Sequence, residues 1–351
     1  MEAKLKSLQD EISDIDIKML NLLNQRASTV KTFYELKNGN NANYFDPIFE
    51  QQMMEQIFTE NKGPLSNEVI IETFKTIFSS WVSLNKCNRK LIVNSDSEQI
   101  FKSINEMFEL PTNMPIIIAG PCSVENYEYL EEIANVLNKN KVRFLRGGAY
   151  KPRTSPYDFQ GLGRKGLEIL SEVSRKYNLI SVTEVIDTRD VDFVTKYSDI
   201  MQVGARNMQN FELLKEVGQT KKPVILKRGI NATVHEFILA AEYIALQGNR
   251  NIILCERGIR TFETKTRNTL DISSIPIIKN ETRIPIIADL SHSLGRKDIV
   301  NPIAKSVFAV GGDGIMVEVH PKPELALSDS KQQLSIEEFG ELLEFLGINN
   351  D

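Results

Sequence analysis

The stretch IIIAG at residues 116–120 is a short apolar run that lacks the polar alternation of a strand facing water on one side. Such runs are typical of strands buried on both faces, which belong to parallel sheets covered by helices. Amphipathic segments with helical periodicity separate most of the similar runs that follow it. These runs are RFLRGG (143–148), ISVTEV (180–185), IMQVG (200–204), VILKRG (224–229), IILCERG (252–258), IPIIADLSHS (284–293) and GIMVEVH (314–320).

Eight strand–helix units over roughly 250 residues are typical of a (β/α)8 TIM barrel. A doubly wound open sheet is the competing fold, because it uses the same alternation of strands and helices. No GxGxxG motif opens the first unit, which disfavours the open sheet. We therefore expect an α/β fold built on a TIM barrel.

The first part of the chain has apolar residues at steps of three and four, as amphipathic helices do. One long helix is predicted to about residue 36, where NGNNAN (38–43) interrupts it. Asp46 and Pro47 are a good helix-starting pair and predict a second helix to about residue 60. Ser66 is expected to cap a third helix that ends near residue 86.

The change of pattern predicts two domains. An all-α, three-helix domain is expected at residues 1–88, and the barrel with a short N-terminal linker at residues 89–351. Three such helices cannot bury their apolar stripes alone, so we expect a dimer that interlocks them.

The composition of the 351 residues, with 41% hydrophobic and 25% charged, is that of an ordinary globular protein. The net charge of −5 argues against a general nucleic-acid-binding surface, which is normally basic. No apolar run approaches the roughly 20 residues that span a bilayer, and the charged start MEAKLKSLQDEIS is unlike a signal peptide. Three widely spaced cysteines form no disulfide framework. We therefore expect a cytoplasmic enzyme without nucleic-acid or membrane partners.

Catalytic groups of a TIM barrel lie at the carboxyl ends of its strands, and nearly every predicted strand here ends in a group that binds anions or metals. Arginine matches phosphate and carboxylate oxygens with two parallel hydrogen bonds, and lysine adds a compact positive charge. Such a set in an acidic chain predicts a small, multiply charged substrate, such as a phosphorylated sugar or acid. The basic residues are Arg146, Lys151, Arg153, Arg206, Lys227 and Arg257.

A second group of residues near the strand ends has the donor atoms of a metal site. It offers a thiolate, an imidazole and carboxylates, a mixture that suits a divalent transition-metal ion. His320 is either a partner of this site or a strand cap, and Cys255 is expected in the core. The predicted donors are Cys122, His292, Glu318 and Asp329.

Seven motifs occur in order between about residues 115 and 339: GPCSVE, LRGGAYKPRTSPYDFQGLG, QVGARNMQN, LKRG, LCERGIRT, SHSLGR and VEVHPKPELALSD. Together they resemble the 3-deoxy-D-arabino-heptulosonate 7-phosphate (DAHP) synthases of the short Iβ subgroup. The resemblance implies condensation of phosphoenolpyruvate (PEP) with erythrose 4-phosphate, the first step of the shikimate pathway. The related 3-deoxy-octulosonate 8-phosphate synthases are the alternative, although they lack the KPRT form of the loop.

The resemblance also implies roles for individual residues. PEP would be held by Arg146, Lys151, Gly204, Ala205, Arg206, Lys227 and Arg257. Lys151, Pro152, Arg153 and Thr154 would line the path of erythrose 4-phosphate. Arg146, Lys151 and Glu184 would be catalytic, and Cys122, His292, Glu318 and Asp329 would hold Mn²⁺ or a similar divalent ion.

The helical domain resembles the AroQ-type chorismate mutases through LQDEISDIDIKMLNLLNQR and YFDPIFE. Two arginines of that family's site are replaced by Gln9 and Phe49, so we predict absent or weak mutase activity. The domain is expected to dimerise or to regulate the barrel with chorismate or prephenate as effector, and family analogy suggests a homotetramer. A fully bifunctional enzyme is the alternative. The matching mutase positions are Arg26, Lys37, Asp46 and Glu50.

Two hypotheses from other functional classes compete with the synthase hypothesis. A barrel that only binds a partner or effector is disfavoured by the intact loop and the complete donor set. A barrel metallohydrolase is disfavoured because such enzymes use several histidines and the chain has three.

Overall fold

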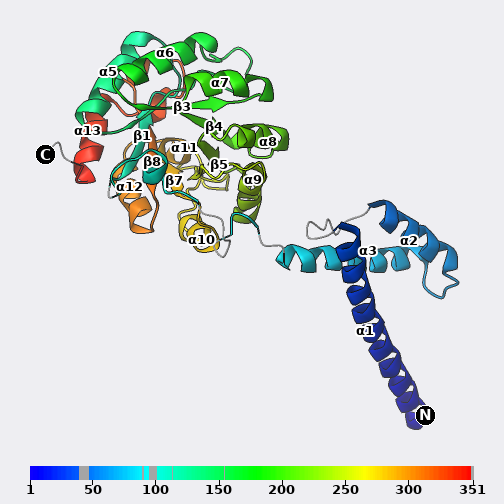
Figure 1. Cartoon of the computed structure of the whole chain (residues 1–351). Coiled ribbons are helices and arrows are strands. Elements are labelled where there is room, and N and C mark those ends of the chain that lie inside the picture. The colour runs from blue at the N-terminus through cyan, green and yellow to red at the C-terminus, as the bar shows by residue number, and fades with distance from the viewer. Residues whose placement is uncertain (39–46, 89–90, 95–100, 113, 154, 349–351) are drawn as a thin grey trace. The chain divides into compact units, whose positions relative to one another are not determined.

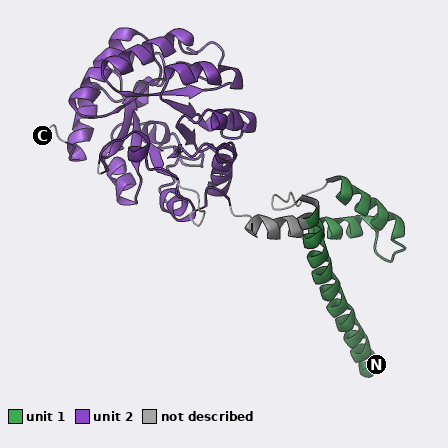
Figure 2. Ribbon diagram, in the orientation of Figure 1, with its two compact units in different colours: residues 1–90 green, residues 91–351 purple. Residues whose placement is uncertain are grey.

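The computed structural model describes residues 1–38, 47–88, 91–94, 101–112, 114–153 and 155–348. The chain separates into two compact units, Met1–Lys90 and Leu91–Asp351 (Figure 2). Among the helices of the described ranges, none is both long enough and apolar enough to cross a bilayer.

The second unit is a closed barrel of parallel strands with helices around it (Figure 1). Each strand pairs with the next along the chain, and the first pairs with the last, which closes the sheet. The predicted (β/α)8 TIM barrel is therefore confirmed. The strands are β1 Ile116–Gly120, β2 Phe144–Arg146, β3 Ile180–Val185, β4 Ile200–Val203, β5 Val224–Lys227, β6 Ile252–Glu256, β7 Ile286–Asp289 and β8 Gly314–Glu318.

The helices around the barrel place apolar stripes against the outward-facing strand residues. In the helix Val234–Leu246, for example, Thr233 and Glu236 form a capping box, and Phe237, Ala241 and Ile244 are buried against the sheet. The helices of this unit are α4 Ile104–Met107, α5 Tyr127–Lys139, α6 Arg164–Lys176, α7 Val191–Tyr197, α8 Phe211–Gln219, α9 Val234–Leu246, α10 Ser274–Glu281, α11 Leu290–Leu294, α12 Val300–Ala309 and α13 Ile336–Phe345.

The barrel interior is filled by side chains from alternate strand positions. Phe108, just after α4, packs edge-to-face on Phe144 of β2 with ring centroids 5.4 Å apart, and so joins the same cluster. Cys255 lies in this cluster, as expected of a core residue. The inward-facing residues are Ile116, Ile118, Phe144, Val182, Ile200, Ile225, Ile253, Cys255, Ile287 and Met316.

The run IPIIADLSHS was predicted as one strand, but it forms a strand followed by a helix. β7 ends at Asp289, whose carboxylate accepts a hydrogen bond from the backbone N–H of His292 at 3.0 Å. This bond caps the N-terminus of α11, so His292 lies in a short helix and not at the strand end. The prediction that His292 ends the strand was wrong, because the capping bond ends the strand at Asp289.

The first unit consists of α1 Glu2–Asn38, α2 Pro47–Glu60 and α3 Asn67–Asn88. The three helices agree with the predicted order and lie within two residues of the predicted ends. The apolar residues on α1 are largely exposed within the chain, for example Leu5 at 55%, Ile12 at 59% and Leu22 at 63%. These exposed apolar residues belong to the stripe that we expected a dimer to bury.

Candidate active site

A cavity of about 280 Å³ lies at the carboxyl ends of the barrel strands. Among the described residues, eight basic side chains line it, against the carboxylates of Asp158, Glu184 and Asp329. The cavity therefore favours a ligand with more than one negative charge. The basic residues are Arg146, Lys151, Arg153, Arg206, Lys227, Arg257, Arg260 and Arg267.

The strand periodicity explains why these side chains face the cavity. Residues two apart on a strand point to the same face, so a residue two positions beyond an inward core residue also points inward. Arg146 follows Phe144, Lys227 follows Ile225, and Arg257 follows Cys255 in this way. Arg228, one position out of step, instead pairs outside the cavity with a carboxylate of β6 at 2.8 Å.

Several of the basic groups are deeply buried and already paired. The guanidinium of Arg146 contacts Glu318 at 2.6 Å, and the ammonium of Lys151 donates to the carbonyl of Cys122 at 3.2 Å. Lys227 pairs with Asp289. Burial opposes the charge of Lys151, but the adjacent Cys122 side chain and the carboxylate of Glu318 raise its pKa.

Arg257 differs from these groups. Its side chain is 7% exposed, and its Nη1 atom has no hydrogen-bond partner among the described residues. Burial lowers the pKa of this guanidinium; the charge of Asp289 opposes the shift, and the charge of Arg267 adds to it. A buried donor that lines the cavity without a partner is suited to receive a ligand oxygen.

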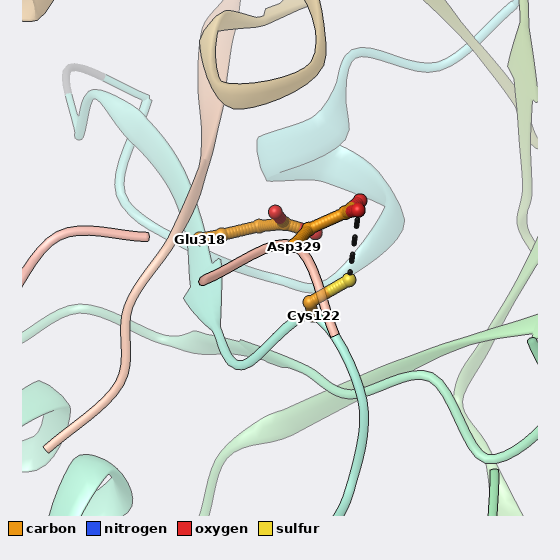
Figure 3. Close-up of side chains that lie close together, drawn as sticks. All are labelled: Cys122, Glu318 and Asp329. Atoms are coloured by element: carbon orange, nitrogen blue, oxygen red, sulfur yellow. Dashed lines mark hydrogen bonds between the residues drawn. The ribbon is translucent and has the colours of Figure 1, made fainter. Parts of the chain in front are cut away.

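Three of the predicted metal donors, Cys122, Glu318 and Asp329, converge at one side of the cavity (Figure 3), and His292 lies beside two of them. Single donor atoms of Cys122, Glu318 and Asp329 all lie within 4.8 Å of one another, and the Cys122 Sγ lies 3.6 Å from Asp329 Oδ2. The His292 Nε2 lies 3.6 Å from Glu318 Oε1 and 3.7 Å from Asp329 Oδ2. This thiol, imidazole and carboxylate set fits a divalent transition-metal ion.

Neighbouring elements bring these donors together. Glu318 ends β8 beside Gly120 of β1, and Cys122 follows β1 by two residues. Asp329 comes from the connection between β8 and α13 and has a left-handed backbone, with φ of 46°. A non-glycine residue in this conformation costs energy and is often found at functional sites.

The electrostatics of the donors fit cation binding. Burial, together with the charge of Glu318, raises the pKa of the Cys122 thiol to about 12. Burial opposes the charge of Glu318, but His292, Arg146 and Lys151 hold its pKa well below the usual range. Burial lowers the pKa of His292, which favours the neutral, metal-binding imidazole. The thiol needs a nearby cation to ionise at neutral pH, as a bound metal ion would provide.

Glu184 lies in the cavity beside β4. Its Oε2 accepts a hydrogen bond from the side chain of Gln202 at 3.2 Å, and its Oε1 lies against the backbone of Gly204. A Cβ atom on Gly204 would be only 2.0 Å from that Oε1, so the carboxylate can lie this close to the backbone only because residue 204 is glycine. Ala205 and Arg206 follow in a 3-10 helix and also line the cavity.

The loop after β2 supplies the remaining predicted residues. Pro152 and Arg153 line the cavity, and the guanidinium of Arg153 lies 3.4 Å from Asp158 and 3.8 Å from Asp329. Thr154 lies outside the described residues. All the other barrel residues predicted for substrate or metal line the cavity, except Cys122 and Glu318, which contact residues that line it.

A family model for the DAHP synthetase I family matches residues 110–349. The chain belongs to this family. The resemblance predicted from the motifs, and the prediction of a DAHP synthase enzyme, are therefore confirmed.

Relatives of the DAHP synthase domain include a phospho-2-dehydro-3-deoxyheptonate aldolase of Thermotoga maritima. It is 60% identical over 228 residues, which cover 65% of this chain and 68% of that protein. A 2-dehydro-3-deoxyphosphooctonate aldolase of Syntrophobacter fumaroxidans is 31% identical over 253 residues, covering 67% of this chain and 87% of that protein.

The solved structures that the chain resembles include two of DAHP synthases. A DAHP synthase of Thermotoga maritima matches with a TM-score of 0.69 and 52% identity, over 73% of this chain and 75% of that one. A truncated form of the 3-deoxy-D-arabino-heptulosonate 7-phosphate synthase of that organism matches with a TM-score of 0.66 and 50% identity, over 73% and 94% of the two chains.

The first unit of this DAHP synthase matches the chorismate mutase type II family over residues 8–86, as predicted. Phe49, in place of an expected arginine, stacks on Phe33 with ring centroids 5.3 Å apart. The guanidinium of Arg26 lies over the Phe78 ring, 4.7 Å from its centroid. Glu50 is half-buried, while Asp46 and the side chain of Lys37 lie outside the described part of the chain.

Several residues that line the cavity of the DAHP synthase domain, or contact its lining and metal-donor residues, were not predicted. Asp289 and Gln202 follow inward-facing residues at the two-residue step, so the strand period was a usable signal for both. Arg267 reaches the mouth from a loop, where no such period exists. The residues missed are Asp158, Gln202, Arg260, Arg267, Asn268, Asp289 and Gln332.

Proposed function

We propose that the barrel condenses PEP with erythrose 4-phosphate to give DAHP and inorganic phosphate, the first step of the shikimate pathway. C3 of PEP forms a bond with the aldehyde carbon, water adds at C2, and phosphate leaves as the C2–O bond breaks. The observation that carries the proposal is the basic cavity that adjoins the four convergent metal donors. The 60% identity to the Thermotoga aldolase supports the same reaction.

The two substrates are anions that repel each other, so the main task of the site is to hold them in contact. We assign PEP to the inner part of the cavity, where the buried Nη1 of Arg257 would meet a phosphate or carboxylate oxygen. Arg153, in the more exposed loop after β2, would meet the phosphate of erythrose 4-phosphate. The proposed PEP residues are Arg146, Lys151, Gly204, Ala205, Arg206, Lys227 and Arg257, and the aldose residues are Lys151, Pro152, Arg153 and Thr154.

Cys122, His292, Glu318 and Asp329 would hold a divalent ion, Mn²⁺ or similar, because their donor atoms fit one in number and kind. When bound, such an ion supplies Lewis acidity toward the aldehyde oxygen. The site residues fix the orientation of both substrates around it.

Proton transfer is assigned to two residues of this mouth. The raised pKa of Lys151 keeps its ammonium protonated, so it is a donor toward the oxygen of the former aldehyde. Glu184, whose Oε2 accepts a hydrogen bond from Gln202 at 3.2 Å, would accept a proton of the water that adds at C2. Arg146 would stabilise the departing phosphate.

The test measures phosphate release from PEP by the full chain. We expect release that requires erythrose 4-phosphate, stops with a chelator and returns with added Mn²⁺. Release with arabinose 5-phosphate in place of erythrose 4-phosphate would indicate the octulosonate reaction. No release with either sugar would support a non-catalytic barrel.

We also propose that the first unit dimerises or regulates the barrel, with chorismate or prephenate as effector and little or no mutase activity. The support is the chorismate mutase match combined with the Phe49–Phe33 stack, which puts an apolar ring where the family has a cation. A homotetramer is the proposed assembly. Chorismate turnover by the full chain at ordinary mutase rates would favour the bifunctional alternative instead.

A further inference from the structure

The side chain of Gln332 connects three charged groups beside the proposed metal site. Its Nε2 donates to Glu318 Oε2 at 2.5 Å and to Asp329 Oδ2 at 3.4 Å. Its Oε1 accepts a hydrogen bond from Arg267 Nη1 at 2.6 Å. The residue is only 4% exposed, so an uncharged amide lies almost fully buried between two carboxylates and a guanidinium.

The chemistry of the neighbours determines which way this amide points. A guanidinium is only a donor, so the group that faces Arg267 must be the carbonyl oxygen of Gln332. Ionised carboxylates are only acceptors, so the amide nitrogen must face Glu318 and Asp329. The reverse orientation would lose all three hydrogen bonds.

Gln332 gives the two oxygens of Glu318 different surroundings. Oε2 is held by the amide at 2.5 Å, whereas Oε1 accepts a hydrogen bond from Arg146 Nη1 at 2.6 Å and faces His292 Nε2 at 3.6 Å. With Arg146 on Oε1 and Gln332 on Oε2, the two contacts together fix the carboxylate plane, and Oε1 is the oxygen turned toward His292. Glu318 itself is fully buried, so water cannot replace this hydrogen bond easily.

The same amide also ties the two acidic donors to each other. Glu318 ends β8, while Asp329 belongs to the following connection and has the left-handed backbone noted above. Gln332 ends the 3-10 helix Ser330–Gln332, and its backbone N–H donates to the carbonyl of Asp329 at 3.3 Å. One residue thus touches both carboxylates and the backbone that carries one of them.

We propose that Gln332 is a positioning residue that sets the carboxylates of Glu318 and Asp329 for a divalent ion, with Arg267 holding its amide in place. The inference rests on the proposed metal site and adds to it a residue that is not itself a ligand. Outer partners of metal ligands typically change metal affinity by about 10- to 100-fold when they are lost.

The test measures equilibrium binding of Mn²⁺ alone to the full chain. Gln332→Met keeps the length of the side chain but removes its hydrogen bonds, and Gln332→Asn keeps the amide but shortens its reach. We expect Mn²⁺ affinity to fall about 10- to 100-fold for Gln332→Met and less for Gln332→Asn. Saturating Mn²⁺ should restore most of the turnover.

Asn249→Leu is the matched control. Asn249 is 1% exposed, and its amide also joins two backbone groups, the Asn251 N–H and the Lys222 carbonyl, each at 2.8 Å. It lies before β6, away from the strand ends that carry the donors. Its loss should lower thermal stability but leave Mn²⁺ affinity unchanged. The visible spectrum of the Co²⁺-loaded chain should change in Gln332→Met and not in Asn249→Leu.

The possible results separate the two proposals. Wild-type chain that binds Mn²⁺, with both Gln332 variants within twofold of it, would overturn the role of Gln332 and leave the metal site standing. An equal loss of affinity in Asn249→Leu would also overturn it, because the effect would then be general destabilisation. Wild-type chain with no Mn²⁺ affinity would overturn the metal site and this inference together.

Discussion

At Gly204 the backbone runs close beside the carboxylate of Glu184, the proposed proton acceptor. Its φ of −69° is ordinary, so alanine there meets no backbone strain, but the new Cβ would lie 2.0 Å from Glu184 Oε1. The flexible carboxylate would move away at little cost in stability. We therefore expect Gly204→Ala to lower kcat/KM by about 10- to 100-fold with little change in the melting temperature.

Gly340→Ala is the control for that variant. Gly340 lies inside α13, and a Cβ there meets nothing within 4 Å. Alanine in a helix interior is favoured over glycine by about 0.5–1 kcal/mol, so this variant should be slightly more stable and equally active. Unchanged steady-state kinetics in Gly204→Ala would show that the position of Glu184 does not matter for turnover.

At the scale of residues, the two-residue strand period made much of the site predictable. Arg146, Lys227 and Glu318 each follow an inward core residue by two positions, so their direction could be inferred once the strands were recognised. The contacts of Gln332 could not be inferred in this way. They depend on the path of a connection that has no regular period, and on Arg267 arriving from another loop.

At the scale of elements, an ionic contact joins the end of β5 to the start of α10. Arg228 donates to Glu256 at 2.8 Å and to Asp271 at 2.9 Å, and Asp271 also accepts from Ser273 at 2.5 Å. Burial opposes the charge of Asp271, but the Ser273 hydroxyl and the Arg228 guanidinium together lower its pKa below the ordinary value of 3.8.

This lowered pKa predicts a pH dependence of stability. A carboxylate with a depressed folded-state pKa stabilises the fold above its unfolded pKa, and the contribution is lost as the pH falls through the folded value. At neutral pH, Asp271→Asn should lower the free energy of unfolding by about 1–2 kcal/mol. The difference from wild type should shrink below about pH 4.

Chemical denaturation of both proteins across this pH range is the measurement. A difference between wild type and Asp271→Asn that stays constant into strong acid would show that the charge of Asp271 contributes nothing.

The order and type of the barrel elements were predictable because apolar runs and amphipathic segments alternate so regularly. The boundary after β7 was not. Leu290 and Ser293 extend the buried run and look like more strand, but the Asp289 carboxylate captures the His292 N–H and starts a helix. A local hydrogen bond of this kind competes with the sheet and leaves little trace in hydropathy.

At the scale of the whole molecule, the exposed apolar residues of α1 are the basis for expecting an oligomer. Ile12 is 59% exposed and Met19 is 53% exposed, on a helix of 37 residues. Burying such a stripe in an interface between copies would stabilise both. We expect the full chain to be oligomeric. The oligomer of the double variant Ile12→Glu/Met19→Glu should dissociate into smaller species, as measured by sedimentation equilibrium.

Lys18→Glu on the same helix is the control, since it changes charge without touching the apolar stripe. A wild-type chain that sediments as a monomer would contradict the proposed dimerising role of the first unit. Equal dissociation by the control would point to charge repulsion and not to the stripe.

The central claim is that one mouth of the barrel holds a metal ion and PEP side by side. The most direct measurement is an anomalous difference map from crystals of the chain with Mn²⁺ and PEP. The account predicts an ion about 2.0–2.5 Å from the donor atoms of Cys122, His292, Glu318 and Asp329, with the PEP oxygens on Arg206, Lys227 and Arg257. An ion bound elsewhere, or PEP bound away from these three cations, would contradict it.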